Sequence, residues 1–269
     1  MDPDDVVART ADLPDAVLRY DGRPDAVIDL HLPPSHIAEA SGAAPLVVLL
    51  HGGFWRQEWD RTHTRALADA LAREGFVVAT PEYRRVGGAG VAAGGWPTTF
   101  EDVSAAMESL PGLLTGLGVA VSSTTVTGHS AGGHLALWLA NEPVRLDRVV
   151  GLAPVGDLRA AAAAHLGDDA TQAFLGGEPG DVPQRYDAAD PVTRLVNRPD
   201  CEVIVVHGKQ DDVVPVTNSR GLQAAHSFVR LHELDGVEHY GVIDPLSPAW
   251  PVVRAAIAGE TVEATPRRG

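Results

Sequence analysis

The sequence has few of the features that would mark several other classes of protein. Cys201 is the single cysteine in 269 residues, so an intrachain disulfide is excluded and nothing indicates an oxidising compartment. Basic residues are also scarce, because 21 lysines and arginines stand against 36 aspartates and glutamates, a net charge of −15. A surface of this sign repels polyanions, so nucleic acid and anionic membranes are not expected as partners.

Long apolar runs are missing as well. No stretch approaches the ~18 apolar residues of a membrane span. The N-terminal MDPDDVVARTADLPD is acidic where a secretory signal peptide is basic, and it has no continuous apolar core. The glycine-rich segment 87–95 lacks the Gly-Lys-Ser/Thr end with which a P-loop holds phosphate. We therefore expect a cytoplasmic protein that binds neither membrane nor nucleotide.

The composition is that of an ordinary globular protein. Hydrophobic residues make up 45% and charged residues 21%, which is enough apolar material for a sizeable core. The length lies in the range that α/β folds cover with one domain. We expect a single domain over residues 1–269.

Five short apolar segments rich in β-branched residues recur along the chain. Their apolarity is continuous rather than alternating, which is typical of parallel strands covered on both faces. They lie at 45–50, 76–81, 124–128, 148–154 and 202–208.

Helical patterns separate most of these segments. Leu67 and Leu71 share one face of a helix expected at 62–75, which ends at Gly75. Further elements are expected as a hairpin at 18–33, a strand at 229–234, and helices at 100–114 (interrupted near Pro111), 131–143, 218–228 and 248–259. This order predicts an α/β fold, a mostly parallel, doubly wound sheet flanked by helices.

Residues 156–199 are too many for a simple connection between two strands. They contain the alanine-rich DLRAAAAAHL, which favours a turn of helix. We expect a small cap insertion over the C-terminal edge of the sheet, where ligands bind in open α/β folds.

The segment TTVTGHSAGGHLALWLA contains a G-x-S-x-G pentapeptide centred on Ser130. It falls between a predicted strand and a predicted helix, where a sharp turn with small neighbours lifts a serine hydroxyl to the edge of the sheet. The helix that follows presents free N–H groups toward developing negative charge. Ser130 is therefore the candidate nucleophile.

A serine needs a base, and the base needs a carboxylate that holds its tautomer. On this fold the expected chain order is serine, acid, histidine. Asp211 or Asp212 can supply the acid after the strand at 202–208, and His239 follows the last strand. The residues alone leave the choice between the two aspartates open.

Eleven histidines make each one a weak signal. His207 precedes the acid, and we expect it to support the acid loop through a backbone hydrogen bond. His129 and His134 flank Ser130 too closely in the chain to reach its Oγ. His63 is expected on a helix, as a solvated or core residue.

From PLVVLLHGG through GHSAGG and HGKQDDVVP to EHYGVID, the chain resembles an α/β-hydrolase of the serine esterase type. In the H-G-x-x-D-x-x-V-P pattern of that family the first aspartate is the acid, which implies Asp211. The resemblance implies a triad of Ser130, Asp211 and His239, with no metal and no organic cofactor.

In such enzymes the loop after the third strand supplies half of the oxyanion hole. A tetrahedral intermediate needs N–H donors at ~2.7 to 3.1 Å from the forming oxyanion, and glycines allow that approach. The resemblance implies donors from Gly53, Phe54 and Ala131, with Gly52 shaping the loop.

HGGFW, 51–55, is similar to the H-G-G-x-W signature of kynurenine formamidases, which is also found in related esterases. An aromatic slot for the substrate is expected from Trp55, Trp96 and Tyr240, whereas Arg84 is expected to be structural rather than a partner of a substrate carboxylate. We expect a small-molecule ester or amide as substrate. Carboxylesterase is favoured over kynurenine formamidase, a non-catalytic ligand-binding receptor is the alternative from another class, and a homodimer is compatible with the sequence.

Overall fold

The computed structural model describes residues 3–34 and 42–261, so the expected domain, 1–269, extends beyond the described residues at both ends. Within this part, eight strands form one sheet in the order β1-β2-β4-β3-β5-β6-β7-β8. The strands are β1 (Ala16–Arg19), β2 (Val27–His31), β3 (Ala44–Leu50), β4 (Val77–Pro81), β5 (Val121–His129), β6 (Arg148–Leu152), β7 (Glu202–Gly208) and β8 (Arg230–Leu234).

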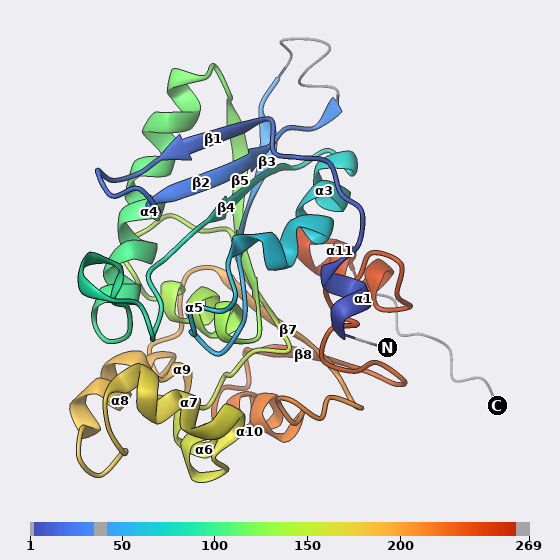
Figure 1. The fold of residues 1–269 in the computed structure, drawn as a ribbon. Coiled ribbons are helices and arrows are strands. Elements are labelled where there is room, and N and C mark those ends of the chain that lie inside the picture. The colour runs from blue at the N-terminus through green and yellow to red at the C-terminus, as the bar shows by residue number, and fades with distance from the viewer. Residues whose placement is uncertain (1–2, 35–41, 262–269) are drawn as a thin grey trace, which may run out of the picture.

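The sheet is parallel from β4 to β8, whereas β1 pairs antiparallel with β2 and β2 antiparallel with β4. The predicted hairpin and all the predicted strands are present. The α/β-hydrolase fold, a mostly parallel sheet flanked by helices, is thus confirmed (Figure 1).

Helices cover both faces of this sheet (Figure 1). They are α1 (Pro3–Val7), α3 (Arg65–Arg73), α4 (Thr98–Gly116), α5 (Ala131–Leu139), α6 (Leu158–Ala163), α7 (Leu166–Leu175), α8 (Pro183–Ala189), α9 (Pro191–Arg194), α10 (Thr217–Ala225) and α11 (Trp250–Ala258), with 3-10 turns η1 (Arg61–Thr64) and η2 (Gly90–Ala92).

The expected interruption near Pro111 is wrong, because α4 runs through it without a break. Proline removes one helical hydrogen bond, but Pro111 itself lies at an exposed position, and the helix continues past it to Gly116.

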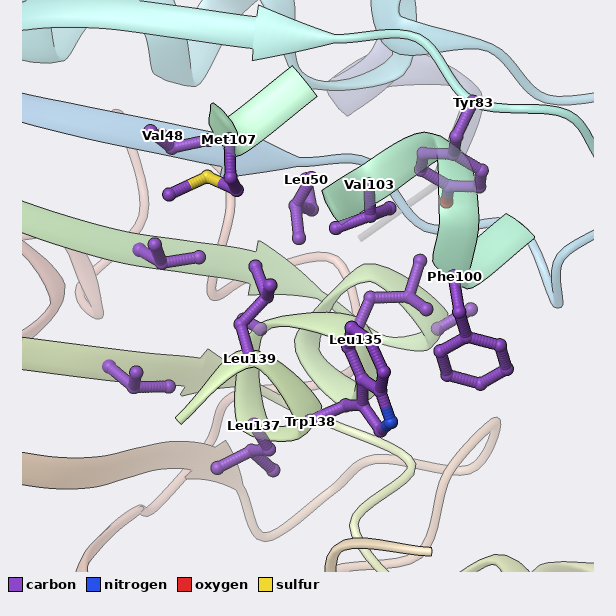
Figure 2. Close-up of a cluster of buried hydrophobic side chains, with 14 of the residues drawn as sticks. Val48, Leu50, Tyr83, Phe100, Val103, Met107, Leu135, Leu137, Trp138 and Leu139 are labelled. Carbon is purple, nitrogen blue, oxygen red and sulfur yellow. The ribbon is translucent and has the colours of Figure 1, made fainter. Parts of the chain in front are cut away.

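The strand β3 shows why its apolar run is continuous. Val48 and Leu50 point into the cluster that also contains α4 and α5 side chains, whereas Val47 and Leu49 point into the cluster on the opposite face, with α3 and α11. Figure 2 shows the first cluster, with Val48 and Leu50 beside Met107 and Val103 of α4.

The connection from β6 to β7 contains α6, α7, α8 and α9, which lie together at one end of the sheet (Figure 1). Its buried side chains, Phe174, Tyr186 and Leu195 among them, belong to the same apolar cluster as the α4 face of the sheet. Two α5 side chains also bond to its backbone, since His134 Nε2 lies 3.0 Å from Ala189 O and Trp138 Nε1 donates to Ala188 O at 3.1 Å. The insertion expected at 156–199 is therefore helical and joined to the core; its role as a cap stays a prediction.

One carboxylate inside this insertion makes stability depend on pH. Asp190 is 1% exposed and accepts hydrogen bonds from Val192 N at 3.1 Å and Arg159 N at 3.3 Å. Burial, reinforced by the charge of Asp157, raises the pKa of Asp190 from 3.8 to about 6. Between these values the folded protein binds the extra proton, so the free energy of unfolding falls as pH rises from about 4 to about 6.

Asp190→Asn is expected to remove this part of the pH dependence. The loss of free energy of unfolding between pH 4.5 and pH 7.5 should be smaller than in the wild type by about 2 kcal/mol, since one pKa unit corresponds to about 1.4 kcal/mol. Urea unfolding of the wild type and of Asp190→Asn at both pH values measures these free energies. Asp187→Asn is the matched control, because Asp187 pairs with the same Arg159 but is 60% exposed; an equal pH dependence in Asp190→Asn and wild type would contradict the expectation.

Candidate active site

The carboxyl ends of the central strands meet at one edge of the sheet. Leu50 at the end of β3 lies opposite Gly128 of β5, and Gly208 at the end of β7 lies opposite Leu234 of β8. The loops that leave this edge carry the HGGFW segment, Ser130, the two candidate aspartates and His239. Parallel pairing thus brings together residues that are up to about 190 positions apart in the chain.

Ser130 stands on a sharp turn between β5 and α5. Its backbone has φ 55° and ψ −117°, a conformation that costs energy for a non-glycine residue. A Cβ on Gly128 would lie 2.3 Å from the carbonyl oxygen of Gly132, and one on Gly132 would lie 2.2 Å from that of Leu50. Only glycine fits at either place, which explains the pentapeptide physically. The Ser130 N–H donates to Leu152 O at 2.9 Å and so ties the turn to β6.

The structure separates the two candidate acids. Asp211 is buried and its Oδ2 lies 2.6 Å from His239 Nδ1, whereas Asp212 is exposed. The other oxygen of Asp211 accepts from Val213 N at 3.0 Å and Val214 N at 2.8 Å. Burial opposes ionisation of Asp211, but the hydrogen bonds from His207 and His239 outweigh it and hold the pKa of this carboxyl well below its usual value. Asp211 is thus the carboxylate paired with His239.

His207 lies on the other side of this carboxylate. Its Nε2 is 2.8 Å from Val214 O and 3.1 Å from Asp211 Oδ2, two acceptors that only an N–H can serve. The expected bond from His207 to the backbone of the acid loop is confirmed. The direct contact with Asp211 was missed, although the spacing of four residues between His207 and Asp211 was a usable signal.

The HGGFW loop lies directly against Ser130. A Cβ on Gly52 would be 2.9 Å from His129 O and 3.2 Å from Ser130 Cβ. Gly53, Phe54 and Trp55 all have positive φ, of 102°, 50° and 56°. Two strained non-glycine residues in succession must be held by their surroundings.

Contacts on two sides hold this loop. The Arg56 guanidinium donates to Gly167 O at 2.5 Å and Asp168 O at 2.9 Å, at the start of α7, and the Phe54 ring fills the space where Gly167 would carry a Cβ, 2.8 Å away. On the other side, His51 Nε2 lies 3.0 Å from Glu82 Oε1. These anchors could not be found from the sequence, because no local pattern joins residue 56 to 167.

The expected aromatic slot needs a correction. Trp55 is 0% exposed and stacks on Phe174 with ring centroids 4.4 Å apart, so it is a core residue that offers no surface to a substrate. The Trp55 ring points into the core because α7, which carries Phe174, packs over the loop. Trp96 is half-buried against Phe100, and Tyr240 is half-buried with its ring centroid 5.3 Å from that of His239. Their contact with substrate stays a prediction.

The described part of the chain has neither a cluster of metal-binding side chains nor a membrane-spanning helix. Residues 3–34 and 42–261 contain no group of three or more His, Cys, Asp or Glu side chains placed to hold a metal ion. None of the helices in these ranges is long and apolar enough to cross a membrane.

Fold and site together define an α/β-hydrolase of the serine esterase class. The model of the BD-FAE family matches residues 28–225, which is most of the chain, and the protein belongs to this family. No curated protein matches the sequence.

Solved structures of the same fold include several esterases. A truncated carbohydrate esterase from gut microbiota has 18% identity and a TM-score of 0.75, over 94% of this chain and 97% of that one. Esterase B from Lactobacillus rhamnosis has 19% identity and a TM-score of 0.76, over 95% and 88%. A thermophilic esterase from Thermogutta terrifontis, bound to propionate, has 19% identity and a TM-score of 0.69, over 91% and 92%. At these identities the likeness concerns the fold.

Proposed function

We propose that the protein hydrolyses carboxylic esters of small molecules through an acyl-enzyme, with Ser130 as nucleophile, His239 as general base and Asp211 as the acid that orients it. The observation that carries the proposal is the 2.6 Å contact between Asp211 Oδ2 and His239 Nδ1, at the sheet edge where the strained turn presents Ser130.

In this mechanism Asp211 accepts the hydrogen on His239 Nδ1, which leaves Nε2 free to take a proton. Ser130 Oγ attacks the ester carbonyl carbon as His239 removes its proton. The N–H groups of Gly53, Phe54 and Ala131 bind the oxyanion that forms. His239 then protonates the departing alcohol, and a water, activated by the same histidine, hydrolyses the acyl-enzyme and restores Ser130.

The neighbourhood of the site favours an ester over N-formylkynurenine. A formamidase needs a flat aromatic slot for the leaving aniline, and the burial of Trp55 removes one of the three residues expected to form it. Arg84, which could have met the substrate carboxylate, donates to both oxygens of Asp102 at 2.8 and 2.6 Å. Several neighbours of this fold are esterases, one a carbohydrate esterase and one solved with propionate, which supports a small acyl group. Kynurenine formamidase remains the second candidate because of H-G-G-x-W.

A substrate panel tests the proposal. We expect kcat/KM for p-nitrophenyl acetate and butyrate to exceed that for N-formylkynurenine by about 10²-fold or more, the discrimination that several lost contacts produce. A preference for N-formylkynurenine would reverse the choice between the two enzymes.

A fluorophosphonate probe separates an enzyme from a non-catalytic receptor, since the proposal requires Ser130 to be labelled. Size-exclusion chromatography with light scattering tests the homodimer, and cell fractionation tests the cytoplasmic location.

A further inference from the structure

The residue before the nucleophile, His129, joins three parts of the active site through one imidazole ring. The ring belongs to the turn that carries Ser130. Its Nε2 lies 3.0 Å from the carbonyl oxygen of His239, and its Nδ1 lies 3.0 Å from His63 Nε2. A Cβ on Gly52, in the HGGFW loop, would come 3.0 Å from the same Nδ1. The ring is therefore enclosed by the nucleophile turn, the HGGFW loop and the loop that bears His239.

The partners of the ring determine where its hydrogen lies. A carbonyl oxygen only accepts, so Nε2 of His129 carries the hydrogen and donates it to His239 O. In a neutral ring Nδ1 is then the acceptor, and the hydrogen of the bond between the two rings belongs to His63 Nε2. The two histidines thus form two consecutive hydrogen bonds with the same direction: His63 donates to His129, and His129 donates to the backbone carbonyl of His239.

Both rings are suited to remain neutral. His129 is 1% and His63 5% exposed. Burial, together with the neighbouring His239 and His63, lowers the pKa of His129 well below its ordinary value. Burial, with His51 and His239 nearby, lowers the pKa of His63 to about 3. These hydrogen bonds should therefore keep their direction at the neutral pH at which an esterase works.

We propose that His129, held in one tautomer by His63, is a positioning residue for the catalytic base: its Nε2–H fixes the His239 peptide and thereby the direction in which the His239 side chain leaves the backbone. The inference rests on the proposed role of His239. Asp211 holds the His239 ring at Nδ1, and His129 holds its backbone, so the base is restrained at both ends. The Tyr240 ring, 5.6 Å from that of His129 and 5.3 Å from that of His239 between centroids, packs beside this arrangement.

Three variants measure the effect. In His129→Phe the ring is kept and both hydrogen bonds are lost, and we expect kcat for p-nitrophenyl acetate to fall about 10²-fold with KM within about threefold, since a misplacement of about 1 Å can cost that much. In His129→Gln the side chain reaches a donor toward His239 O, and we expect at least a tenfold recovery of kcat. The control is His134→Phe, because His134 is equally buried, lies one turn along α5, and bonds to a backbone carbonyl, that of Ala189, away from His239; its kcat should stay within about threefold of wild type.

The tautomers can be read in the wild-type protein without any assay of activity. Ring ¹⁵N NMR shifts at pH 7 should show Nε2 protonated and Nδ1 bare in both His129 and His63, with assignments from the spectra of His129→Gln and His63→Gln. A hydrogen on Nδ1 of His129, or equal kcat in His129→Phe and His134→Phe, would overturn the positioning role. Failure of the proposed function would give a different result. Full turnover in Ser130→Ala would reject the catalytic triad, but the NMR spectra would still show the tautomers of His129 and His63 stated above.

Discussion

Replacement of Ser130 by alanine is expected to lower kcat for p-nitrophenyl acetate by about 10⁴- to 10⁶-fold, because removal of the nucleophile leaves only the oxyanion donors and substrate binding to accelerate hydrolysis. The fold should be unaffected, since Oγ is the only atom lost and alanine keeps the Cβ that the turn already accommodates. A spectrophotometric assay with thermal unfolding of both proteins measures the two quantities together.

Ser109→Ala is the matched control for this variant. Ser109 lies on α4 and its hydroxyl donates to Tyr20 O at 3.4 Å, next to the edge strand β1 and not to the central strand β5 that leads to Ser130. Its kcat should equal that of the wild type. Turnover in Ser130→Ala at the wild-type level would show that another group attacks the ester, and the triad would have to be abandoned.

Asp211→Asn is expected to reduce kcat by roughly 10³- to 10⁴-fold, because an amide holds the wrong tautomer of the base and does not stabilise the imidazolium that forms. The low pKa of Asp211 means that its carboxylate is ionised throughout the pH range of an assay, so the wild-type enzyme always has this charge in place. Measurement of kcat at pH 7 to 9 in both proteins gives the effect.

The neighbouring residue provides an unusually close control. Asp212→Asn changes the same chemical group one position along, but Asp212 is exposed whereas Asp211 accepts from His239, His207 and two backbone amides. We expect kcat of Asp212→Asn within about twofold of wild type. If the two variants lose activity equally, Asp211 does not have the separate role proposed for it.

Much of the fold could be predicted because it follows from local patterns. The runs of valine, leucine and isoleucine in β3 and β7 are apolar on both faces, and such segments are typical of a parallel sheet that is covered on both sides. The position of Ser130 was visible because its turn demands glycine at Gly128 and Gly132. Pro111 is an exception: it suggested a broken helix, but α4 runs through this exposed position without a break.

The aromatic residues show where local reasoning stops. Trp55 follows the loop that approaches Ser130, and proximity in sequence suggested contact with substrate. The direction of its side chain depends on α7, which places Phe174 against the ring from about 120 residues away. His129 is a second example. Its position beside Ser130 in the sequence indicated only that its ring cannot reach Ser130 Oγ, and gave no sign of its contact with the His239 backbone.

The sequence by itself determined the class of fold and the turn that carries Ser130, the proposed nucleophile, since apolar periodicity and glycine requirements are properties of short segments. It also restricted the acid to two adjacent aspartates. Only the tertiary structure decided that Asp211 meets His239, that Trp55 is core and that His129 reaches the His239 backbone. These three contacts depend on how separate loops pack at one edge of the sheet. Their energies are set by the distances and orientations between residues of different segments, which the sequence of one segment does not specify.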